Sequence, residues 1–167
     1  MTLTLLLIRH AKSEPGAPMQ PDHERTLNAR GRHDAPRMGR WIAERGLIPQ
    51  EVLCSDAQRT RETLDLMLPL WPEPPRLSHR GTLYHATTDA MLRVLAEAEG
   101  ERVALVGHNP GIGALASLLA REAPSHPRWN DYPTCAVAAL AFEAGSWAEI
   151  AEGGGQVVAF GIPADLD

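Results

Sequence analysis

Short apolar runs and longer amphipathic segments alternate along this chain. Residues Leu3 to Ile8 are continuously apolar, without the polar alternation of a half-exposed strand. Such a run is typical of a strand covered on both faces of a parallel sheet. Two further short strands are predicted at Glu51 to Ser55 and at Val103 to Val106. The pattern therefore indicates a buried, mostly parallel sheet.

Four segments between and after these strands carry apolar residues at helical spacing. The first helix is expected to begin near Asp34, because Pro36 favours the first turn of a helix. The other three helices are expected to begin at Ser55, Thr88 and Asn109, whose side chains can cap a helix N-terminus. Strands that alternate with helices predict an α/β fold.

The last part of the chain has a different pattern. Residues 71 to 80 are rich in proline and are expected to be irregular, whereas the apolar runs after Cys135 are broken at glycines and predict a terminal antiparallel meander. Trp129 fits either the core or the mouth of a pocket. We expect one domain over residues 1–167, a three-layer αβα sandwich with a mostly parallel central sheet and an antiparallel C-terminal edge.

Composition narrows the classes of function. The formal net charge of -5 and the sequence pI of about 5.8 provide no general attraction to nucleic acid or to an anionic membrane. The N-terminal apolar run is too short for a secretory signal, and no segment approaches a membrane span. Cys54 and Cys135 each lie in an apolar run and are interpreted as buried thiols. We expect a cytoplasmic protein without a cofactor.

Basic residues follow the three predicted parallel strands. Arg9-His10 follows the first strand, Arg59 the second and His108 the third. Because ligands of open α/β sheets bind at the carboxyl ends of the strands, these four side chains are expected to share one pocket. A cation early in a helix is locally unfavourable, so the position of Arg59 indicates a function rather than a stabilising role.

This set of side chains suits phosphoryl transfer. Two guanidinium groups can grip phosphate oxygens by paired hydrogen bonds. A neutral imidazole is a nucleophile toward phosphorus, and neighbouring arginines disfavour its protonation. We therefore predict that His10 accepts the phosphoryl group while Arg9, Arg59 and His108 stabilise its charge. No residues show metal-ligand spacing, so no metal site is predicted.

Three motifs together resemble those of the histidine phosphatase superfamily. They are Arg9-His10, the run Ser55 to Thr63 (SDAQRTRET), and Gly107 to Gly111 (GHNPG). Residues 25 to 31 (RTLNARG) and the terminal meander are most similar to the SixA-like phosphohistidine phosphatase branch, so the resemblance covers nearly the whole chain. It implies a phosphoglycerate mutase-like fold, a phosphohistidine intermediate on His10, and substrate contacts from Arg25 and Asn109.

The sequence departs from phosphoglycerate mutase-like members at the proton donor. Where those members have a leucine, any residue and then an acidic residue, this chain has Leu83-Tyr84-His85. The general acid therefore stays open between His85, Glu14 and Asp22, or none is needed.

The predicted substrate is phosphohistidine on a protein, or alternatively a small phosphomonoester. A phosphoglycerate mutase-like exchanger is a second hypothesis, and the missing acid argues against it. A non-catalytic phosphate-binding module is a third. The presence of both histidines argues against the module, because arginines and backbone amides suffice for binding alone.

Overall fold

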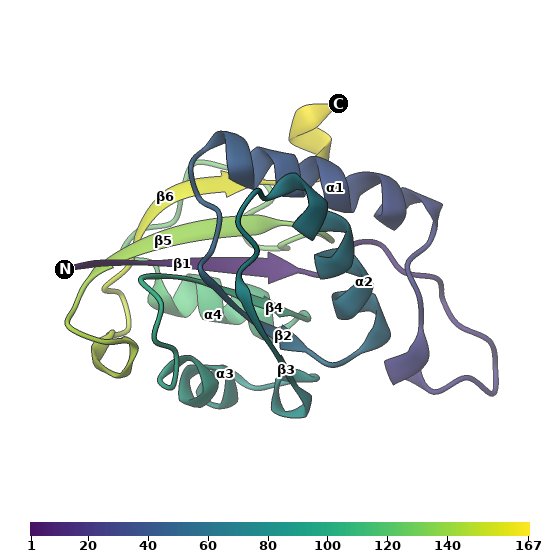
Figure 1. Ribbon diagram of the computed structural model, residues 1–167, viewed down its shortest axis with the longest axis horizontal. Coiled ribbons are helices and arrows are strands. Elements are labelled where there is room, and N and C mark those ends of the chain that lie inside the picture. Colours follow the sequence, from purple (N-terminus) through teal and green to yellow (C-terminus); the bar gives the residue numbers. More distant parts are fainter.

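The computed structural model describes residues 1–167 and contains a six-stranded sheet with helices on both faces (Figure 1). The strands are β1 (Thr2–Arg9), β2 (Glu51–Ser55), β3 (Arg76–Arg80), β4 (Arg102–Gly107), β5 (Val137–Glu143) and β6 (Gln156–Gly161). The helices are α1 (Ala29–Glu44), α2 (Gln58–Met67), α3 (Thr88–Leu95) and α4 (Gly111–Leu119). Strand order is β3-β2-β4-β1-β5-β6, with β1 to β4 parallel and β5 antiparallel to both neighbours. The predicted α/β sandwich with an antiparallel C-terminal edge is confirmed.

Strand β1 is buried on both of its faces. Leu5 and Leu7 belong to the core that includes the inner faces of α3 and α4. Leu6 and Ile8 belong to a second core, shared with α1 and α2. Burying each such side chain contributes about 1.5–3 kcal/mol, so both faces favour apolar residues and no alternation survives in the sequence.

The order of the strands brings three strand ends together. β4 lies between β1 and β2, with Arg9 paired to Gly107 and Cys54 paired to Val106. The chain segments that leave β1, β4 and β2 therefore begin side by side at one edge of the sheet, as expected for parallel strands.

Helix α1 begins at Ala29, five residues before the predicted start at Asp34. The side chain of Asn28 accepts a hydrogen bond from the Gly31 amide at 2.9 Å and caps the helix there. Pro36 lies inside the helix. A buried apolar face and an effective cap outweigh the backbone hydrogen bond that the proline cannot make.

The predicted cap of α2 is also wrong. The helix begins at Gln58 with Ala57 at the N-cap position and no side-chain cap, because Ser55 is still the last residue of β2. The hydroxyl of Ser55 is hydrogen-bonded to the imidazole of His108. In α3 the cap is Thr87 rather than Thr88. Helix α4 begins at Gly111 with Pro110, rather than Asn109, at the N-cap position. Asn109 lies one residue earlier, and its side-chain oxygen accepts a hydrogen bond from the Gly113 amide at 3.1 Å.

Two further expectations are settled by packing. Residues 76 to 80, predicted to be irregular, form the edge strand β3, which pairs in parallel with β2. Trp129 is buried in the core, with its ring 5.1 Å from that of Phe160.

Cys54 and Cys135 are buried free thiols, as predicted. No helix has the length and apolar character needed to cross a membrane.

The N-terminus of α1 packs tightly against the segment that follows β1. A Cβ atom at Gly31 would collide with the backbone carbonyl of Lys12. The Asn28 amide donates a hydrogen bond to that same carbonyl at 3.0 Å. A glycine at position 31 therefore lets the helix approach the residues just beyond His10.

Gly31→Ala is expected to lower the free energy of unfolding by about 2 kcal/mol, because backbone atoms must shift to admit the methyl group. Gly100→Ala is the matched control, since its added methyl would lie 3.4 Å from the nearest atom, an ordinary contact. Urea denaturation of both variants measures the difference. Equal losses of stability would contradict this account of the contact.

Candidate active site

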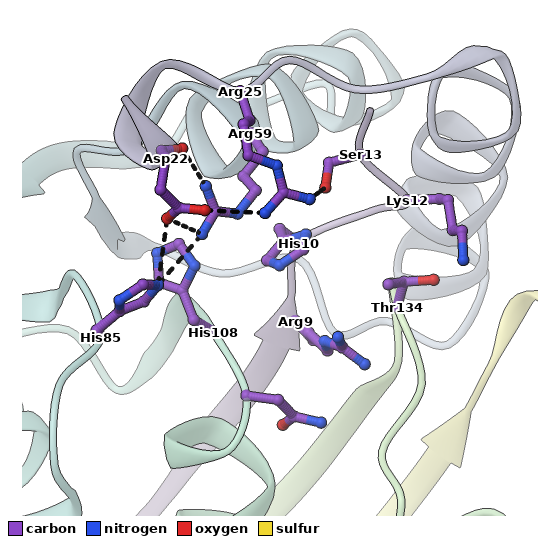
Figure 2. A pocket seen from close by; sticks show the side chains of 11 residues that line it. Arg9, His10, Lys12, Ser13, Asp22, Arg25, Arg59, His85, His108 and Thr134 are labelled. Carbon is purple, nitrogen blue, oxygen red and sulfur yellow. Dashed lines mark hydrogen bonds and ion pairs between the residues drawn. The ribbon is translucent and has the colours of Figure 1, made fainter. Parts of the chain in front are cut away.

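A cavity of about 310 Å³ opens where β1, β2 and β4 end (Figure 2). Its lining is entirely polar and consists of Arg9, His10, Lys12, Ser13, Asp22, Arg25, Arg59, His85, His108, Asn109 and Thr134. All six side chains predicted for the site are among them. Four positively charged side chains, at positions 9, 12, 25 and 59, share the cavity with a single carboxylate, although the whole chain carries a net charge of -5. The cavity therefore favours an anion.

His10 is held as a neutral imidazole with one free nitrogen. Its Nδ1 lies 2.7 Å from the carbonyl oxygen of Ala11, which can only accept, so Nδ1 carries the proton. Burial, followed by the charges of Arg59 and Arg9, lowers the pKa of His10 to about 4. At neutral pH its Nε2 therefore has a lone pair available for a nucleophilic role.

The backbone around His10 is anchored on both sides. The His10 amide donates to the carbonyl of Gly107 at 3.1 Å, which ties it to the end of β4. The Ala11 amide donates to the hydroxyl of Thr63 on α2 at 2.9 Å. The imidazole is thus positioned by two neighbouring elements rather than by a free loop.

His108 is a second buried imidazole, with its ring centroid 5.4 Å from that of His10. Its Nε2 lies 2.8 Å from the hydroxyl of Ser55, while its Nδ1 is buried and has no partner. Burial, with the nearby His10 and Arg59, lowers the pKa of His108 to about 3. A bound phosphate dianion would raise that pKa, because an opposite charge favours the protonated ring.

Asp22 clamps the two guanidinium groups of Arg25 and Arg59. Arg59 donates to its carboxylate at 3.0 Å and to its backbone carbonyl at 2.8 Å, and Arg25 donates to the other carboxylate oxygen at 2.9 Å. Arg25 also donates to the hydroxyl of Ser13 at 2.8 Å. The Arg59 side chain is only 4% exposed, so its direction is set by these bonds. The clamp aims two cations along one wall of the cavity.

The opposite wall is set by Tyr132. Arg9 and Asn109 both donate to the backbone carbonyl of Tyr132, at 3.1 and 3.0 Å. The Tyr132 hydroxyl in turn donates to the Leu7 carbonyl of β1. The loop before β5 thereby orients one predicted catalytic residue and one predicted substrate-binding residue.

The three candidates for the general acid are placed differently. Asp22 accepts hydrogen bonds from the hydroxyl of Tyr84 and from the two arginines. These hydrogen bonds, that of Tyr84 first, lower the pKa of Asp22 far below its usual range. Asp22 is therefore ionised at neutral pH and has no proton to donate. Glu14 is exposed and does not line the cavity. His85 does line it, with its Nε2 3.3 Å from Arg59 and 3.5 Å from Asp22.

Sequence reasoning did not identify Lys12, Ser13, Ser55 or Thr134 as parts of the site. Lys12 and Ser13 follow the Arg9-His10 motif after a single alanine, so their position was the available signal. Ser55 begins the motif run that ends at Thr63, which was the signal for it, whereas Thr134 comes from a distant segment and gave none. No group of three or more His, Cys, Asp or Glu side chains is placed to hold a metal ion.

Comparisons with known proteins show the family to which this chain belongs. The family model of the histidine phosphatase superfamily (branch 1) matches residues 5–80. The uncharacterized protein ML1117 of Mycobacterium leprae is 32% identical, over 93% of this chain and 99% of that protein.

Two solved structures resemble the whole chain. A protein from Nakamurella multipartitia, assigned as phosphohistidine phosphatase SixA, matches with a TM-score of 0.77 and 29% identity over 98% of this chain and 97% of that one. A SixA-assigned protein from Agrobacterium tumefaciens has a TM-score of 0.79 at 24% identity, over 96% and 98% of the two chains. The second likeness shows the fold alone.

The depressed pKa of His10 predicts both its titration and a pH effect on stability. The folded protein keeps the ring neutral down to about pH 4, whereas an ordinary histidine titrates near 6.5. Between these two pH values the unfolded chain therefore binds more protons than the folded protein. The stability falls as the pH drops from 6.5 toward 4, and above pH 6.5 this histidine contributes no pH dependence.

NMR titration of the histidine rings, assigned with His10→Asn, measures the pKa directly. Denaturation at pH 7 and pH 5 should show a smaller acid-induced loss of stability in His10→Asn than in the unsubstituted protein. A His10 ring that titrates near 6.5 would contradict the predicted desolvation.

Proposed function

Because this chain belongs to the histidine phosphatase superfamily, we propose that it is a phosphatase that carries the phosphoryl group on Nε2 of His10. One observation supports this role above the others. The hydrogen bond from Nδ1 of His10 to the Ala11 carbonyl leaves the Nε2 lone pair free, in a cavity lined by four positively charged side chains. The nucleophile and the groups that attract its substrate thus share one site.

In the first step, Nε2 of His10 attacks phosphorus in line with the leaving group. The bond from phosphorus to nitrogen forms while the bond from phosphorus to the leaving atom breaks. Arg9, Arg25 and Arg59 neutralise charge on the phosphoryl oxygens. The three guanidinium groups are already oriented by Tyr132 and Asp22, so little reorganisation is needed at the transition state.

His108 contributes a proton when a phosphoryl group is bound beside it. Its Nδ1 is buried without a partner, and the ring is neutral because burial lowers its pKa to about 3. A phosphoryl dianion next to this ring favours its protonation and gains a further hydrogen-bond donor. The second step is attack by water on phosphorus, which breaks the bond to Nε2 and releases phosphate and the restored imidazole.

The leaving group determines which substrates this site can process. Expulsion of an alkoxide benefits from a proton donor, worth about 10²–10⁴-fold in rate. Asp22 is ionised and Glu14 lies outside the cavity, so His85 remains as the one candidate donor of the three. A phosphorylated imidazole is a better leaving group and depends mainly on alignment and positive charge. These features favour phosphohistidine on a protein as the substrate.

The entrance to the cavity supports a protein substrate. Only the short 3-10 helix Gly81–Leu83 lies between β3 and the cap of α3, so this connection builds no deep lid over His10. The similarity to the N. multipartitia protein assigned as SixA supports the same substrate class. A phosphorylated side chain of another protein can thus reach His10 from outside.

His10→Ala is expected to abolish turnover, a loss of at least about 10³-fold, because it removes the attacking nitrogen. His79→Ala, an exposed histidine on β3, is the matched control and should retain full activity. Both are assayed with phosphoramidate as a phosphoryl donor, with EDTA present, since no metal is predicted to take part.

Trapping during turnover should give a phosphoenzyme that is labile to acid and stable to alkali, in the unsubstituted protein and His79→Ala but not in His10→Ala. Phosphate binding without any phosphoenzyme would instead identify a binding module. A phosphoenzyme stable to acid would place the intermediate on another residue type.

The protein should process a phosphohistidine-bearing protein with a higher kcat/KM than phosphoglycerate, since the former needs no strong proton donor. The kcat/KM values for the two substrates and an aryl phosphate are compared under one set of conditions. Equal or better use of phosphoglycerate would move the assignment to a metabolite phosphatase.

His85→Gln separates the role of the remaining candidate acid. If His85 protonates the leaving group, this change lowers kcat/KM for phosphoglycerate by about 10²-fold and changes the value for phosphohistidine far less. Equal losses on both substrates would show that His85 positions Arg59 rather than donating a proton.

A further inference from the structure

A second cavity, of about 280 Å³, adjoins the candidate active site and shares Lys12 and Thr134 with it. Figure 2 shows these two residues on the side of the site opposite Asp22 and His85. Two further bases line the second cavity, Arg30 from the first turn of α1 and Arg128 from the loop before β5. None of the functions discussed above uses these two bases.

Of the three basic side chains that line this cavity, Lys12 alone has no carboxylate partner. Asp34 is the one carboxylate in its lining, and that side chain is 5% exposed and already paired with Arg30 at 2.9 Å and with Arg37 at 3.3 Å. Asp167 pairs with the same two arginines, at 3.3 and 3.0 Å. Arg128 pairs with Asp131 at 2.7 Å, and both of these side chains are about half exposed. The ammonium of Lys12 has no ion-pair partner. The cavity can therefore take an additional anion.

We propose that Lys12 and Arg128 form a second anion subsite, which binds the carboxylate of an acidic side chain close to the phosphohistidine of a protein substrate. This inference rests on the proposed phosphatase function and names the local sequence that the enzyme prefers. Lys12 lines both cavities, so it lies between the transferred phosphoryl group and the second anion.

The walls of the subsite fit an amino-acid side chain. Ile162 and Pro163, near the C-terminus, provide an apolar surface beside the bases, suited to the methylene groups of a glutamate. Thr134 lies where the two cavities meet. A carboxylate carried on a short aliphatic stem therefore meets apolar wall and positive charge together.

The arrangement around the phosphate site favours an extended chain over a small metabolite. On the other side, a cavity of about 460 Å³ shares His85, His108 and Asn109 with the candidate active site and includes Ala86 and Pro110 in its lining. The phosphate site is thus flanked by hollows on both sides. An extended polypeptide advances about 3.3–3.6 Å per residue, so neighbours of a phosphohistidine can occupy both hollows.

The test measures binding of peptides that carry a triazolylphosphonate, a non-hydrolysable analogue of phosphohistidine. Glutamate is placed at each of the three positions before and after the analogue, and every peptide has a matched glutamine version. At one position or more, the glutamate peptide should bind about fivefold more tightly, the effect of one partly exposed ion pair. Because exposed charges are screened by salt, this preference should shrink in 0.5 M NaCl.

Lys12→Gln and Arg128→Gln should each reduce the preference for glutamate toward unity. Arg93→Gln is the matched control, because it removes one exposed positive charge from α3, outside all three cavities. It should retain the fivefold preference. The readout is the ratio of two dissociation constants for each variant, so a general change in phosphate affinity cancels.

Equal binding of glutamate and glutamine peptides at every position would overturn the subsite, as would a preference that survives both substitutions. If phosphoglycerate displaces the bound peptides more effectively than the glutamate peptides do, the subsite is assigned to a small metabolite instead. Trapping of the phosphoenzyme on His10 is scored separately. A glutamate preference without a phosphoenzyme would leave the subsite standing and remove the proposed chemistry.

Discussion

The candidate active site depends on one constraint of the sheet, namely that β1, β4 and β2 are parallel neighbours that end at the same edge. Arg9 and Gly107 are paired across β1 and β4, so His10 and His108 leave the sheet side by side. A change of strand order would separate the two imidazoles and Arg59. The apolar residues on both faces of β1 therefore stabilise the site as well as the fold, because they keep the strand in the middle of the sheet.

The same edge concentrates groups that oppose one another electrostatically. Burial, followed by the positive charges around the two imidazoles, lowers the pKa of His10 to about 4 and that of His108 to about 3. Buried donors without a hydrogen-bond partner, Arg9 Nε and Arg59 Nε among them, cost stability. Asp22 reduces the electrostatic repulsion between Arg59 and Arg25 by pairing with both, and the same pairing keeps Asp22 ionised. These unfavourable interactions lower the stability of the folded protein, and the same groups form a site already arranged to receive an anion.

Much of the fold follows from local pattern. The strands β1, β2 and β4 and the terminal meander were predicted because their apolar runs are continuous or regularly broken. The edge strand β3 was missed, since its residues are mostly polar and exposed and it exists through its pairing with β2. The start of α1 was placed at Asp34 from the preference of one proline, whereas the cap at Asn28 and the buried face of the helix decided it.

For the site, the sequence alone determined which chemical groups stand at the ends of the parallel strands, because a motif specifies both a residue and its distance from a strand. It therefore predicted that His10, Arg9, Arg59 and His108 would lie together. Only the tertiary structure decided their protonation, their partners and the surrounding hollows. The bond between Ser55 and His108, the clamp of Asp22 and the cavity beside Lys12 each join segments far apart in the chain. Desolvation and charge depend on which neighbours surround a group in space, and no periodicity of the sequence encodes that neighbourhood.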